Sequence, residues 1–388
     1  METYKLSDLC EILDSKRKPL SALQRAKKQG IYPYYGAQGI IDHLDDYLLD
    51  GEYLLVAEDG ANLETRNQPI ANIAKGKIWV NNHAHVLGSN GKCPLNLLGF
   101  ILNNMNISPY VTGCAQPKLN QENLRNIEIE LPSHIDSIAS ILSSLDRKIE
   151  LNNKINADLE EMAQAIFKNW FVDFEPFKDG KFVNSELGMI PEGWKVGRAD
   201  DFYQINIGKT PPRKEHKWFS TNPADKIWVS IANMGNSGIF ISDSSEYLTK
   251  EAVDRHNIIM VPRNTILLSF KLTVGRVAIA DKELTTNEAI ARFILSDDKY
   301  MEYLYLYLKN FDYNSLGSTS SIATAVNSKT IKGMQMLQPS DKIIDAFHIQ
   351  VNPIFEKIRS LTKESSRLSL LRDTLLPRLM SGELEVPE

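Results

Sequence analysis

Cysteine is scarce in this chain. The 388 residues include three cysteines, Cys10, Cys93 and Cys114, and no two of them form a Cys-x-x-Cys pair. Small disulfide-held domains carry an even number of closely spaced cysteines, and structural zinc sites usually take two of their ligands as such a pair. We therefore expect reduced thiols and no disulfide framework.

Long apolar runs are also missing. No stretch of 18 apolar residues occurs, and the start METYKLSDLC has no apolar segment behind a basic one. These features predict a cytoplasmic protein with no membrane partner. Hydrophobic residues make up 43% and charged residues 24%, which is the balance of a folded protein, and the length predicts two domains.

Motifs for nucleotide chemistry are absent as well. No phosphate-binding GxxxxGKS/T loop is present, so ATP-driven translocation is not expected in this chain. Adenine methylation needs a glycine-rich turn for the methyl donor and an Asn/Asp-Pro-Pro-aromatic loop for the flipped base. Residues 36–39 (GAQG) have the wrong spacing for the turn, and residues 222–224 (NPA) lack the second proline and the ring. No catalytic residue is predicted.

A metal site has little support. His83, His85, Cys93 and Cys114 could supply ligands, but they lack the paired spacing of zinc ligands. His83 and His85 fall on one face of a predicted strand, where packing or base contact explains them better. The acidic pair at 58–59, before a glycine, is more typical of a turn at a strand end than of a catalytic pair. No metal is therefore predicted.

The formal net charge of −5 gives no sign of a strongly basic protein. Residues 133-193 and 340-388 hold 13 Lys+Arg against 19 Asp+Glu, whereas residues 1-132 and 194-339 hold 31 against 30. Attraction to phosphate depends on local basic faces, so the two near-neutral segments can bind DNA, though weakly when alone. Help from partner chains is expected.

The chain contains an internal repeat. The stretch NQENLRNIEIELPS from Asn120 aligns without a gap on NSKTIKGMQMLQPS from Asn327, so that Pro132 falls on Pro339. A segment with helical periodicity follows each proline. The repeat therefore predicts two copies of one plan, each a globular domain followed by a helix.

The two helical segments carry a sustained heptad pattern. Apolar residues recur in alternating steps of three and four over residues 135–170 and 344–379, with Asn152, Asn156 and Ser365 filling three of the positions and Arg372 breaking the pattern. A 3.5-residue repeat of this length is typical of helices that pair lengthwise. The alternative is a helix bundle with no spacing role, but further helices to complete one are lacking. Three polar residues would meet near the middle of an antiparallel pair and fix its register: Asn152, Asn156 and Ser365.

The globular segments have strand and turn patterns of their own. Short helices are expected at 94–105 and 299–309, and β-branched and aromatic residues predict strands at 51–59, 76–87, 125–131, 226–232, 264–270, 275–280 and 291–295. The fold class is therefore α+β (mixed α/β) with a pseudo-twofold repeat. The predicted order is domain 1-132, helix 133-172, connector 173-193, domain 194-339, helix 340-380 and tail 381-388.

Several motifs resemble one family, the specificity subunits of type I restriction-modification systems. The segments AIFKNWFVDFEPF (165–177), SELGMIPEGWKV (185–196) and LLPRLMSGELEV (375–386) are similar to its helix ends and its domain entry. The first recognition domain is matched by RKPL (17–20) and YPYYGAQGI (32–40), and the second by IGKTP (207–211), ILLSFKLTVGRVAIA (266–280) and TNEAI (286–290). These motifs cover essentially the whole chain in the family's order.

The resemblance implies a function. It implies two target recognition domains separated by an antiparallel coiled coil, each reading one half of a split sequence in double-stranded DNA. It also implies two docked modification subunits, restriction subunits as further partners, and a non-catalytic role without cofactors. S-adenosylmethionine, ATP and Mg would belong to partner subunits. The alternatives are a fused restriction-methylation enzyme, which would need the missing motifs, and a coiled-coil scaffold, which would bind no DNA.

Residues suited to DNA phosphates form one cluster in each domain, basic residues first and aromatic residues after them. The alternative interpretation of either cluster is a solvated charged loop. The first cluster comprises Lys16, Arg17, Lys18, Arg25, Lys27, Lys28, Tyr32, Tyr34 and Tyr35, and the second comprises Lys209, Thr210, Arg213, Lys214, Lys217, Trp218 and Phe219.

Base reading requires amide, guanidinium or hydroxyl groups that reach base edges. Asn287 could instead cap a turn, and Gln38 could be held by backbone groups. The candidates are Gln38, Asn62, Arg66 and His83 in the first domain, and Asn233, Lys271, Thr273, Arg276 and Asn287 in the second. The recognised DNA sequence does not follow from this set.

Overall fold

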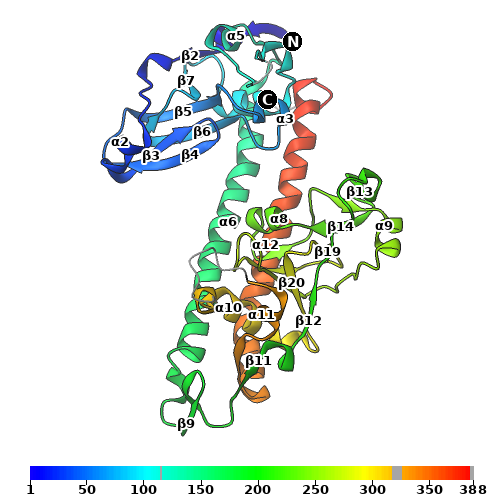
Figure 1. Ribbon diagram of the computed structural model, residues 1–388. Helices are drawn as coiled ribbons and strands as arrows, with labels where there is room; N and C mark the ends of the chain where they lie inside the picture. The colour runs from blue at the N-terminus through cyan, green and yellow to red at the C-terminus, as the bar shows by residue number, and fades with distance from the viewer. Residues whose placement is uncertain (114–115, 317–325, 385–388) are drawn as a thin grey trace. The chain divides into compact units, whose positions relative to one another are not determined.

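The computed structural model describes residues 1–388 except 114–115, 317–325 and 385–388. Cys114 and the end of the predicted tail 381-388 therefore lie outside the described residues. The chain divides into two compact units, Met1–Glu150 with Ser366–Glu388, and Leu151–Ser365 (Figure 1). No helix among the described residues is long and apolar enough to cross a membrane.

The first unit is built on a six-stranded sheet. Its strand order is β2-β7-β5-β6-β3-β4, with β3 and β6 parallel and the other neighbours antiparallel. The elements are β1 (Glu2–Lys5), α1 (Leu6–Leu9), β2 (Cys10–Ile12), η1 (Asp14–Lys16), α2 (Ala22–Ala26), β3 (Gln29–Gly36), β4 (Gly39–Leu44), β5 (Leu49–Ala57), α3 (Asn62–Thr65), β6 (Ala71–Val80), β7 (Ala84–Ser89), α4 (Leu95–Asn104), η2 (Ser108–Tyr110), α5 (Gln121–Arg125) and β8 (Glu128–Leu131).

The second unit is built on a five-stranded sheet and a four-stranded sheet, whose strands interleave along the sequence. The strand orders are β12-β20-β17-β18-β15 and β13-β16-β14-β19. The elements are η3 (Glu175–Phe177), β9 (Phe182–Ser185), β10 (Gly188–Pro191), β11 (Lys195–Arg198), α7 (Ala199–Phe202), β12 (Gln204–Ile207), η4 (His216–Trp218), β13 (Phe219–Ser220), β14 (Lys226–Val229), α8 (Ile231–Asn236), β15 (Phe240–Ile241), β16 (Tyr247–Leu248), α9 (Lys250–Arg255), β17 (Ile266–Ser269), β18 (Val277–Ala280), β19 (Thr285–Thr286), β20 (Ile290–Ile294), η5 (Asp298–Tyr300), α10 (Met301–Asn310), η6 (Tyr313–Leu316), α11 (Ser328–Lys332) and β21 (Gln335–Gln338).

The two units repeat one topology, as the sequence repeat predicts. Reading across the sheets, β2-β7-β5-β6 corresponds to β12-β20-β17-β18, with all neighbours antiparallel, and in each sheet the next strand pairs in parallel, β3 with β6 and β15 with β18. Each domain also opens and closes with one antiparallel strand pair, β1 with β8 and β11 with β21. The short helices α5 and α11 precede the closing strand in the same way, each capped by an asparagine, Asn120 and Asn327.

Local differences from the expected strands have simple causes. The predicted strand 76–87 is divided between β6 and β7 by a turn at 81–83. Strand β14 ends at Val229, because Ser230 caps the helix α8 that follows it. The expected helices at 94–105 and 299–309 are present as α4 and α10.

The long helices α6 (Ile135–Phe171) and α12 (Asp341–Met380) pair antiparallel. In the second unit the Asn152 amide donates to Glu364 Oε2 at 2.9 Å and to Ser365 Oγ at 3.3 Å, and Asn156 donates to Thr362 Oγ1 at 3.3 Å. Asn152 is fully buried. The predicted meeting of Asn152 with Ser365 therefore occurs, whereas Asn156 meets a threonine one turn away.

Arg372 interrupts the apolar pattern of the second helix for a visible reason. In the first unit its guanidinium lies 2.6 Å from Asp146 Oδ1 on α6 and 2.8 Å from Asp373. It also lies over the ring of Phe100 on α4 at 5.9 Å. The charged side chain thus links both long helices to the first domain.

Each domain completes its core on the long helices. In the first unit the core residues of α4, α5 and β8 cluster with Ile138 and Leu142 of α6 and with Leu376 and Leu379 of α12. In the second unit the central sheet and α10 cluster with α6 and α12 through large aromatic side chains. Rings of α6, α10 and α12 meet there edge to face or tilted, among them Phe167, Phe171, Tyr303 and Phe347. A domain exchanged between relatives must therefore keep its helix-facing side chains.

The buried polar contact between the helices should cost stability and confer register. Replacing Ser365 with alanine should lower the free energy of unfolding by about 0.5 to 1 kcal/mol, since Asn152 loses one partner while remaining buried. Adding Asn152→Leu should recover at least that amount, because the buried amide, including an Oδ1 with no hydrogen-bond partner, is removed. Denaturant unfolding of the two variants measures this difference. A double variant less stable than Ser365→Ala alone would contradict it.

Candidate nucleic-acid interface

The same backbone tie holds the ends of a parallel strand pair in both domains, β3 with β6 in the first and β14 with β19 in the second. In the first unit Lys18 N donates to Val80 O at 3.0 Å, and Asn81 N donates to Tyr35 O at 3.0 Å. In the second unit the equivalent bonds run from Lys209 N to Thr286 O at 2.9 Å and from Asn287 N to Val229 O at 3.0 Å. These ties bring the predicted basic segment of each domain to the turn that leads from β6 to β7 in the first domain and from β19 to β20 in the second.

Asn287, a predicted base reader, builds this turn. Its Oδ1 accepts a hydrogen bond from Ala289 N at 3.1 Å, and the Oδ1 of Asn81 accepts one from His83 N at 2.8 Å. Both asparagines use the side-chain-to-backbone bond that such residues favour in turns. The sequence prediction missed Asn81. An alignment of the two halves at the spacing that relates α4 to α10 would have paired it with Asn287.

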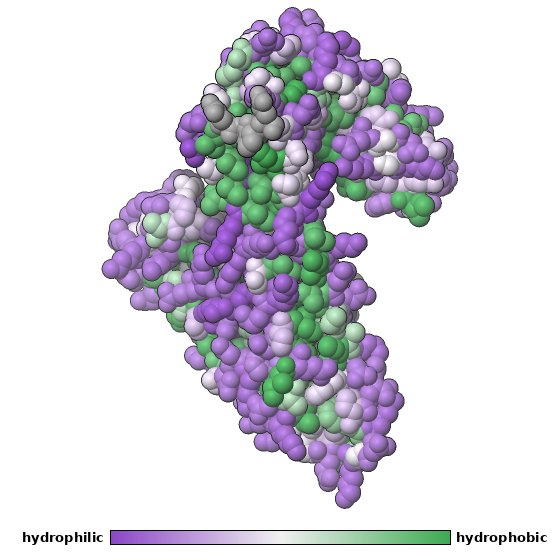
Figure 2. Space-filling model, turned by 180° about the vertical axis from the view of Figure 1, so that it is seen from behind, coloured by the Kyte–Doolittle hydropathy of each residue, from purple (hydrophilic) through white to green (hydrophobic). Residues whose placement is uncertain are grey.

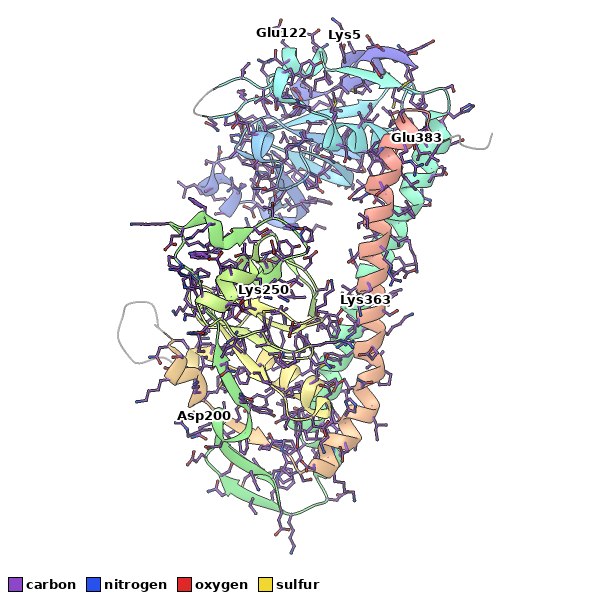
Figure 3. All side chains as sticks on the ribbon, turned by 90° about the vertical axis from the view of Figure 1, so that its right-hand side faces the viewer. Lys5, Glu122, Asp200, Lys250, Lys363 and Glu383 are labelled. Atoms are coloured by element: carbon purple, nitrogen blue, oxygen red, sulfur yellow. The ribbon has the colours of Figure 1, made fainter. Side chains whose placement is uncertain are left out.

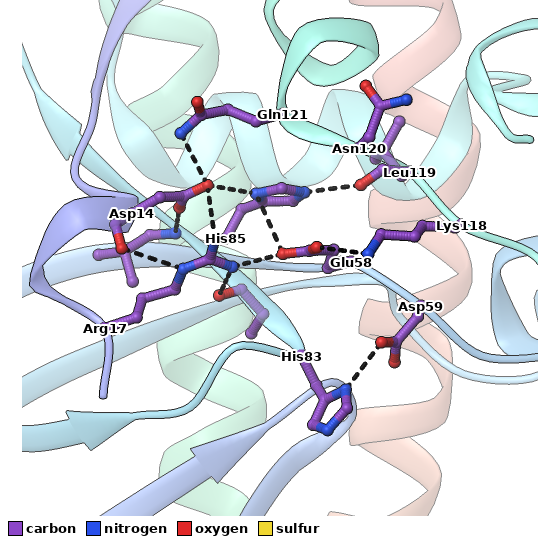
Figure 4. Close-up of polar contacts among 12 residues, drawn as sticks. Asp14, Arg17, Glu58, Asp59, His83, His85, Lys118, Leu119, Asn120 and Gln121 are labelled. Carbon is purple, nitrogen blue, oxygen red and sulfur yellow. Dashed lines mark hydrogen bonds and ion pairs between the residues drawn. The ribbon is translucent and has the colours of Figure 1, made fainter. Parts of the chain in front are cut away.

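Arg17, a predicted DNA contact, belongs to a polar network inside the first unit (Figure 4). Its guanidinium lies 3.2 Å from Asp14 Oδ2 and 2.5 Å from Glu58 Oε2, and it also donates to Ala84 O at 3.1 Å. Lys118 lies 3.1 Å from the other Glu58 oxygen. With its side chain 15% exposed, Arg17 anchors the basic segment to β5 and β7 and has little surface for DNA.

His85 lies fully buried at the centre of the same network (Figure 4). Its Nδ1 is 2.6 Å from Asp14 Oδ2, and its Nε2 is 2.7 Å from the carbonyl oxygen of Leu119. Both ring nitrogens are therefore engaged within the first unit. His83, by contrast, lies in the turn before β7, is exposed, and pairs with Asp59 at 2.7 Å. The two histidines therefore do not share a strand face as predicted.

The two carboxyl groups of the network titrate below their ordinary range. Burial acts to raise the pKa of Asp14 and of Glu58. For Asp14 the hydrogen bond and charge of His85, the backbone hydrogen bond from Val86 and the charge of Arg17 together outweigh burial and lower the pKa. For Glu58 the hydrogen bonds from Arg17 and Lys118 and the charges of His85 and Arg17 together do the same. A lowered folded-state pKa means that the network stabilises the unit above the ordinary carboxyl range and loses this effect as the pH falls through the folded values.

Asp14, Glu58 and His85 offer ligand atoms within 4.8 Å of one another. Both carboxylates are already paired with cations, and both ring nitrogens are hydrogen bonded. The cluster therefore acts as an internal ion-pair network. Cys93 lies in the apolar core, where burial raises its pKa to about 12, and Cys114 is outside the described residues.

Several other predicted residues of the first domain have structural partners. Arg25 pairs with Asp42 at 2.8 Å, and Lys28 lies 3.5 Å from Asp45. Tyr34 is 1% exposed and accepts a hydrogen bond from Leu20 N. Asn62 is buried and closes the loop to Gln68, while Arg66, at φ 51°, donates to the carbonyl oxygens of Leu102 and Asn103 at the end of α4. Tyr32 and Tyr35 are partly buried, and the residues left exposed are Lys16, Lys18, Lys27, Gln38 and His83.

The second domain separates its predicted residues in the same manner. Arg213 pairs with Glu246 at 2.8 Å and stacks on the rings of Phe219 and Trp228 at 4.3 and 4.5 Å. Trp218 is 1% exposed, with Lys217 over its ring at 4.3 Å. Other predicted residues have backbone or capping partners. Lys209 donates to the carbonyl oxygen of His256, and Arg276 donates to that of Ile231. Asn233 takes part in the Ser230 cap of α8.

A polar group remains accessible at the strand ends of the second domain. Thr210 donates to Glu288, an exposed carboxylate in the turn after Asn287, and the positive charge of Lys271 acts on the same carboxylate. Burial acts to raise the pKa of Glu288, but these interactions lower it overall. A carboxylate can accept a hydrogen bond from cytosine N4. The sequence prediction missed Glu288, because its partner Thr210 lies 78 positions away in the chain. Lys214, Lys271 and Thr273 are also exposed.

The family follows from comparison with known proteins. Residues 1–161 and 191–348 match the type I restriction modification DNA specificity domain. The chain belongs to the specificity subunits of type I restriction-modification systems. The match falls on both halves of the repeat, so the repeated topology of this specificity subunit is that of two DNA specificity domains.

Relatives of this specificity subunit come from distant organisms. The specificity subunit of the type I restriction enzyme HindI from Haemophilus influenzae is 28% identical over 331 residues, which cover 69% of this chain and 71% of the relative. That of MjaIX from Methanocaldococcus jannaschii is 33% identical over 288 residues, covering 71% and 65%. The crystal structure of the S subunit of a type I restriction-modification system from M. genitalium superposes with a TM-score of 0.57 at 14% identity, over 98% of this chain and 96% of that one, and supports the fold.

Arg17 and Lys27 should behave differently when replaced by alanine. Arg17→Ala should lower the free energy of unfolding by about 2 to 3 kcal/mol, because it leaves two largely buried carboxylates short of a cation. Lys27→Ala, at an exposed residue, should change it by less than about 0.5 kcal/mol. The matched measurement is denaturant unfolding at neutral pH and again near pH 4, where the Arg17→Ala deficit should shrink. Equal stabilities of the two variants at neutral pH would contradict the structural role of Arg17.

Proposed function

We propose that each globular domain of this specificity subunit reads one block of a split sequence in double-stranded DNA. The observation that carries this proposal is one sheet topology, occurring twice, whose strand-end turns present different exposed side chains. The first domain offers Gln38 and His83 there, and the second offers Lys271, Thr273 and Glu288. Two similar frames with different exposed groups suit two different short sequences.

We further propose that the chain supplies recognition without chemistry. The methyl-donor turn, the Asn/Asp-Pro-Pro-aromatic loop and the phosphate-binding loop are missing from the sequence. Adenine methylation and ATP-dependent cleavage would then reside in modification and restriction subunits, together with S-adenosylmethionine, ATP and Mg. Three of the predicted DNA contacts, Arg17, Arg25 and Arg213, are paired with carboxylates, which leaves fewer cations for phosphate. Specific affinity would therefore depend on those partners.

Two copies of one modification subunit suit the repeat. Each half has a cavity where its opening and closing strands meet the start of a long helix, of about 580 Å³ beside Pro132 and about 460 Å³ beside Pro339. Apolar side chains also reach the surface seen in Figure 2. Those exposed on α6 and α12 are Leu151, Met162, Ile349, Leu370 and Leu371. Exposed apolar residues on the long helices, and a cavity that recurs in both halves, favour protein partners.

The paired helices would set the distance between the two DNA blocks. Their polar contacts fix one register, and each helix contributes to the core of each domain. Lys363 of α12, labelled in Figure 3, lies 3.1 Å from the buried Asp281 of the second domain, which also lies 3.5 Å from Arg359 of the same helix. Such charged contacts add to the apolar ones in holding that domain to the helix.

The test uses the purified chain with and without its modification subunit. Alone, the chain should neither bind S-adenosylmethionine nor methylate DNA, because it lacks a donor site. With the modification subunit, DNA sequencing that detects methylated adenine should reveal a motif of two short blocks separated by unread base pairs. The matched control is the modification subunit alone, which should methylate no split motif. Methylation by the chain alone, or a continuous motif, would overturn the proposal.

A further inference from the structure

Leu272 is the most exposed of the large apolar residues that the structure describes, with 99% of its surface free. It lies at the tip of the hairpin between β17 and β18, with exposed Lys271 before it and exposed Thr273 after it. The next most exposed apolar residues, Leu23 and Ile31 of the first unit, are at 79%. A leucine with almost no protein contact contributes nothing to the fold by burial.

The hairpin tip is held firmly beneath this leucine. The buried Ser269 hydroxyl donates to Thr273 O at 2.5 Å and accepts from Arg276 N at 3.0 Å. Gly275 N donates to Ser269 O at 3.0 Å, and Thr273 N donates to Lys271 O at 2.7 Å, which closes a three-residue turn around Leu272. The tip is therefore a fixed turn that points one apolar side chain outward.

The backbone of Leu272 at the tip is strained. Leu272 has φ 61°, in the left-handed region that few residues other than glycine and asparagine adopt. A strained backbone that persists needs support from its surroundings and is frequent at binding sites. Part of this support comes from below, where Arg276 donates to Ile231 O at 2.8 Å and the glycine at 235 leaves room for its guanidinium.

The neighbours of Leu272 suit nucleic acid. Lys271 is a cation, Thr273 a hydroxyl, and the charge of Lys271 reaches Glu288, the exposed carboxylate that holds Thr210. Side chains that insert between base pairs are apolar wedges such as leucine, flanked by groups that bind phosphates or base edges. An apolar tip within a polar group matches that arrangement.

We propose that Leu272 is a wedge that enters one base-pair step of the DNA block read by the second domain and unstacks it. The proposal rests on the proposed function, because it requires that the second domain bind DNA. It would make this block sensitive to the flexibility of the step as well as to base edges, since flexible pyrimidine-purine steps open most easily. Leu272 would thus determine part of the specificity without a hydrogen bond.

The two domains differ at this point. The first-domain counterpart of the β17–β18 hairpin is the longer connection between β5 and β6, residues 58–70. It begins with two acidic residues and contains α3, whose Leu63 is 1% exposed and packs into the core. The proposal therefore assigns unstacking to the second block alone.

The experiment uses the complex with modification subunits and duplexes that carry the methylated motif with 2-aminopurine at successive positions of the second block other than the methylated adenine. The unmodified complex should raise the 2-aminopurine fluorescence several-fold at one step. Leu272→Asn should reduce that signal to the level of free DNA and weaken specific binding by about tenfold. Leu272→Phe should retain the signal. Asparagine tolerates the left-handed backbone, so the thermal unfolding of the Leu272→Asn variant should match that of the parent protein.

The matched control is Ile259→Asn, which replaces another exposed apolar residue of the same unit, 52% exposed, and should leave the signal intact. Fluorescence that persists in Leu272→Asn, or that falls equally in Ile259→Asn, would overturn the wedge. Specific binding with no unstacking at any step would also overturn it while leaving the proposed function in place. Absence of any split-motif binding by the parent complex would instead refute the proposed function.

Discussion

The antiparallel pairing of α6 and α12 is the contact on which the rest of the structure depends. Neither domain has a closed core without it. The first buries its helical layer against Leu142 and Leu376, and the second surrounds Phe167 and Phe347 with rings and sheet residues. Because each domain is finished by both helices, a shift of one helix along the other would disturb both cores. By fixing the register of the helices, the polar pair Asn152 and Ser365 therefore also helps to fix the packing of both domain cores.

Features with local causes were predicted well from the sequence. The heptads gave both helices to within a few residues, because an apolar stripe is a property of neighbouring positions. The β-branched runs located β5, β17, β18 and β20, and the repeat of the closing strands led to the doubled topology. The short strands β2, β12 and β15 carry too few residues for a pattern and are formed by pairing with distant strands.

The candidate site was predicted less well, for a physical reason. A basic residue in sequence shows its charge but not its partner. Arg17 meets Glu58, Arg25 meets Asp42 and Arg213 meets Glu246, across 41, 17 and 33 positions. Pairing with distant carboxylates converts these predicted phosphate contacts into supports for the loops. The residues left for DNA, such as Gln38 and Lys271, are exposed ones whose assignment to bases stays a prediction.

The central claim is that the helix pair spaces two independent readers. It is tested most directly by inserting four residues after Ala157 and a matching four after Leu361, opposite one another in the pair, so that the register is kept. One turn adds about 6 Å, or roughly one to two base pairs of DNA. Sequencing of methylated adenines should then show both blocks unchanged and the gap between them longer by that amount. An unchanged gap with full methylation would contradict the account.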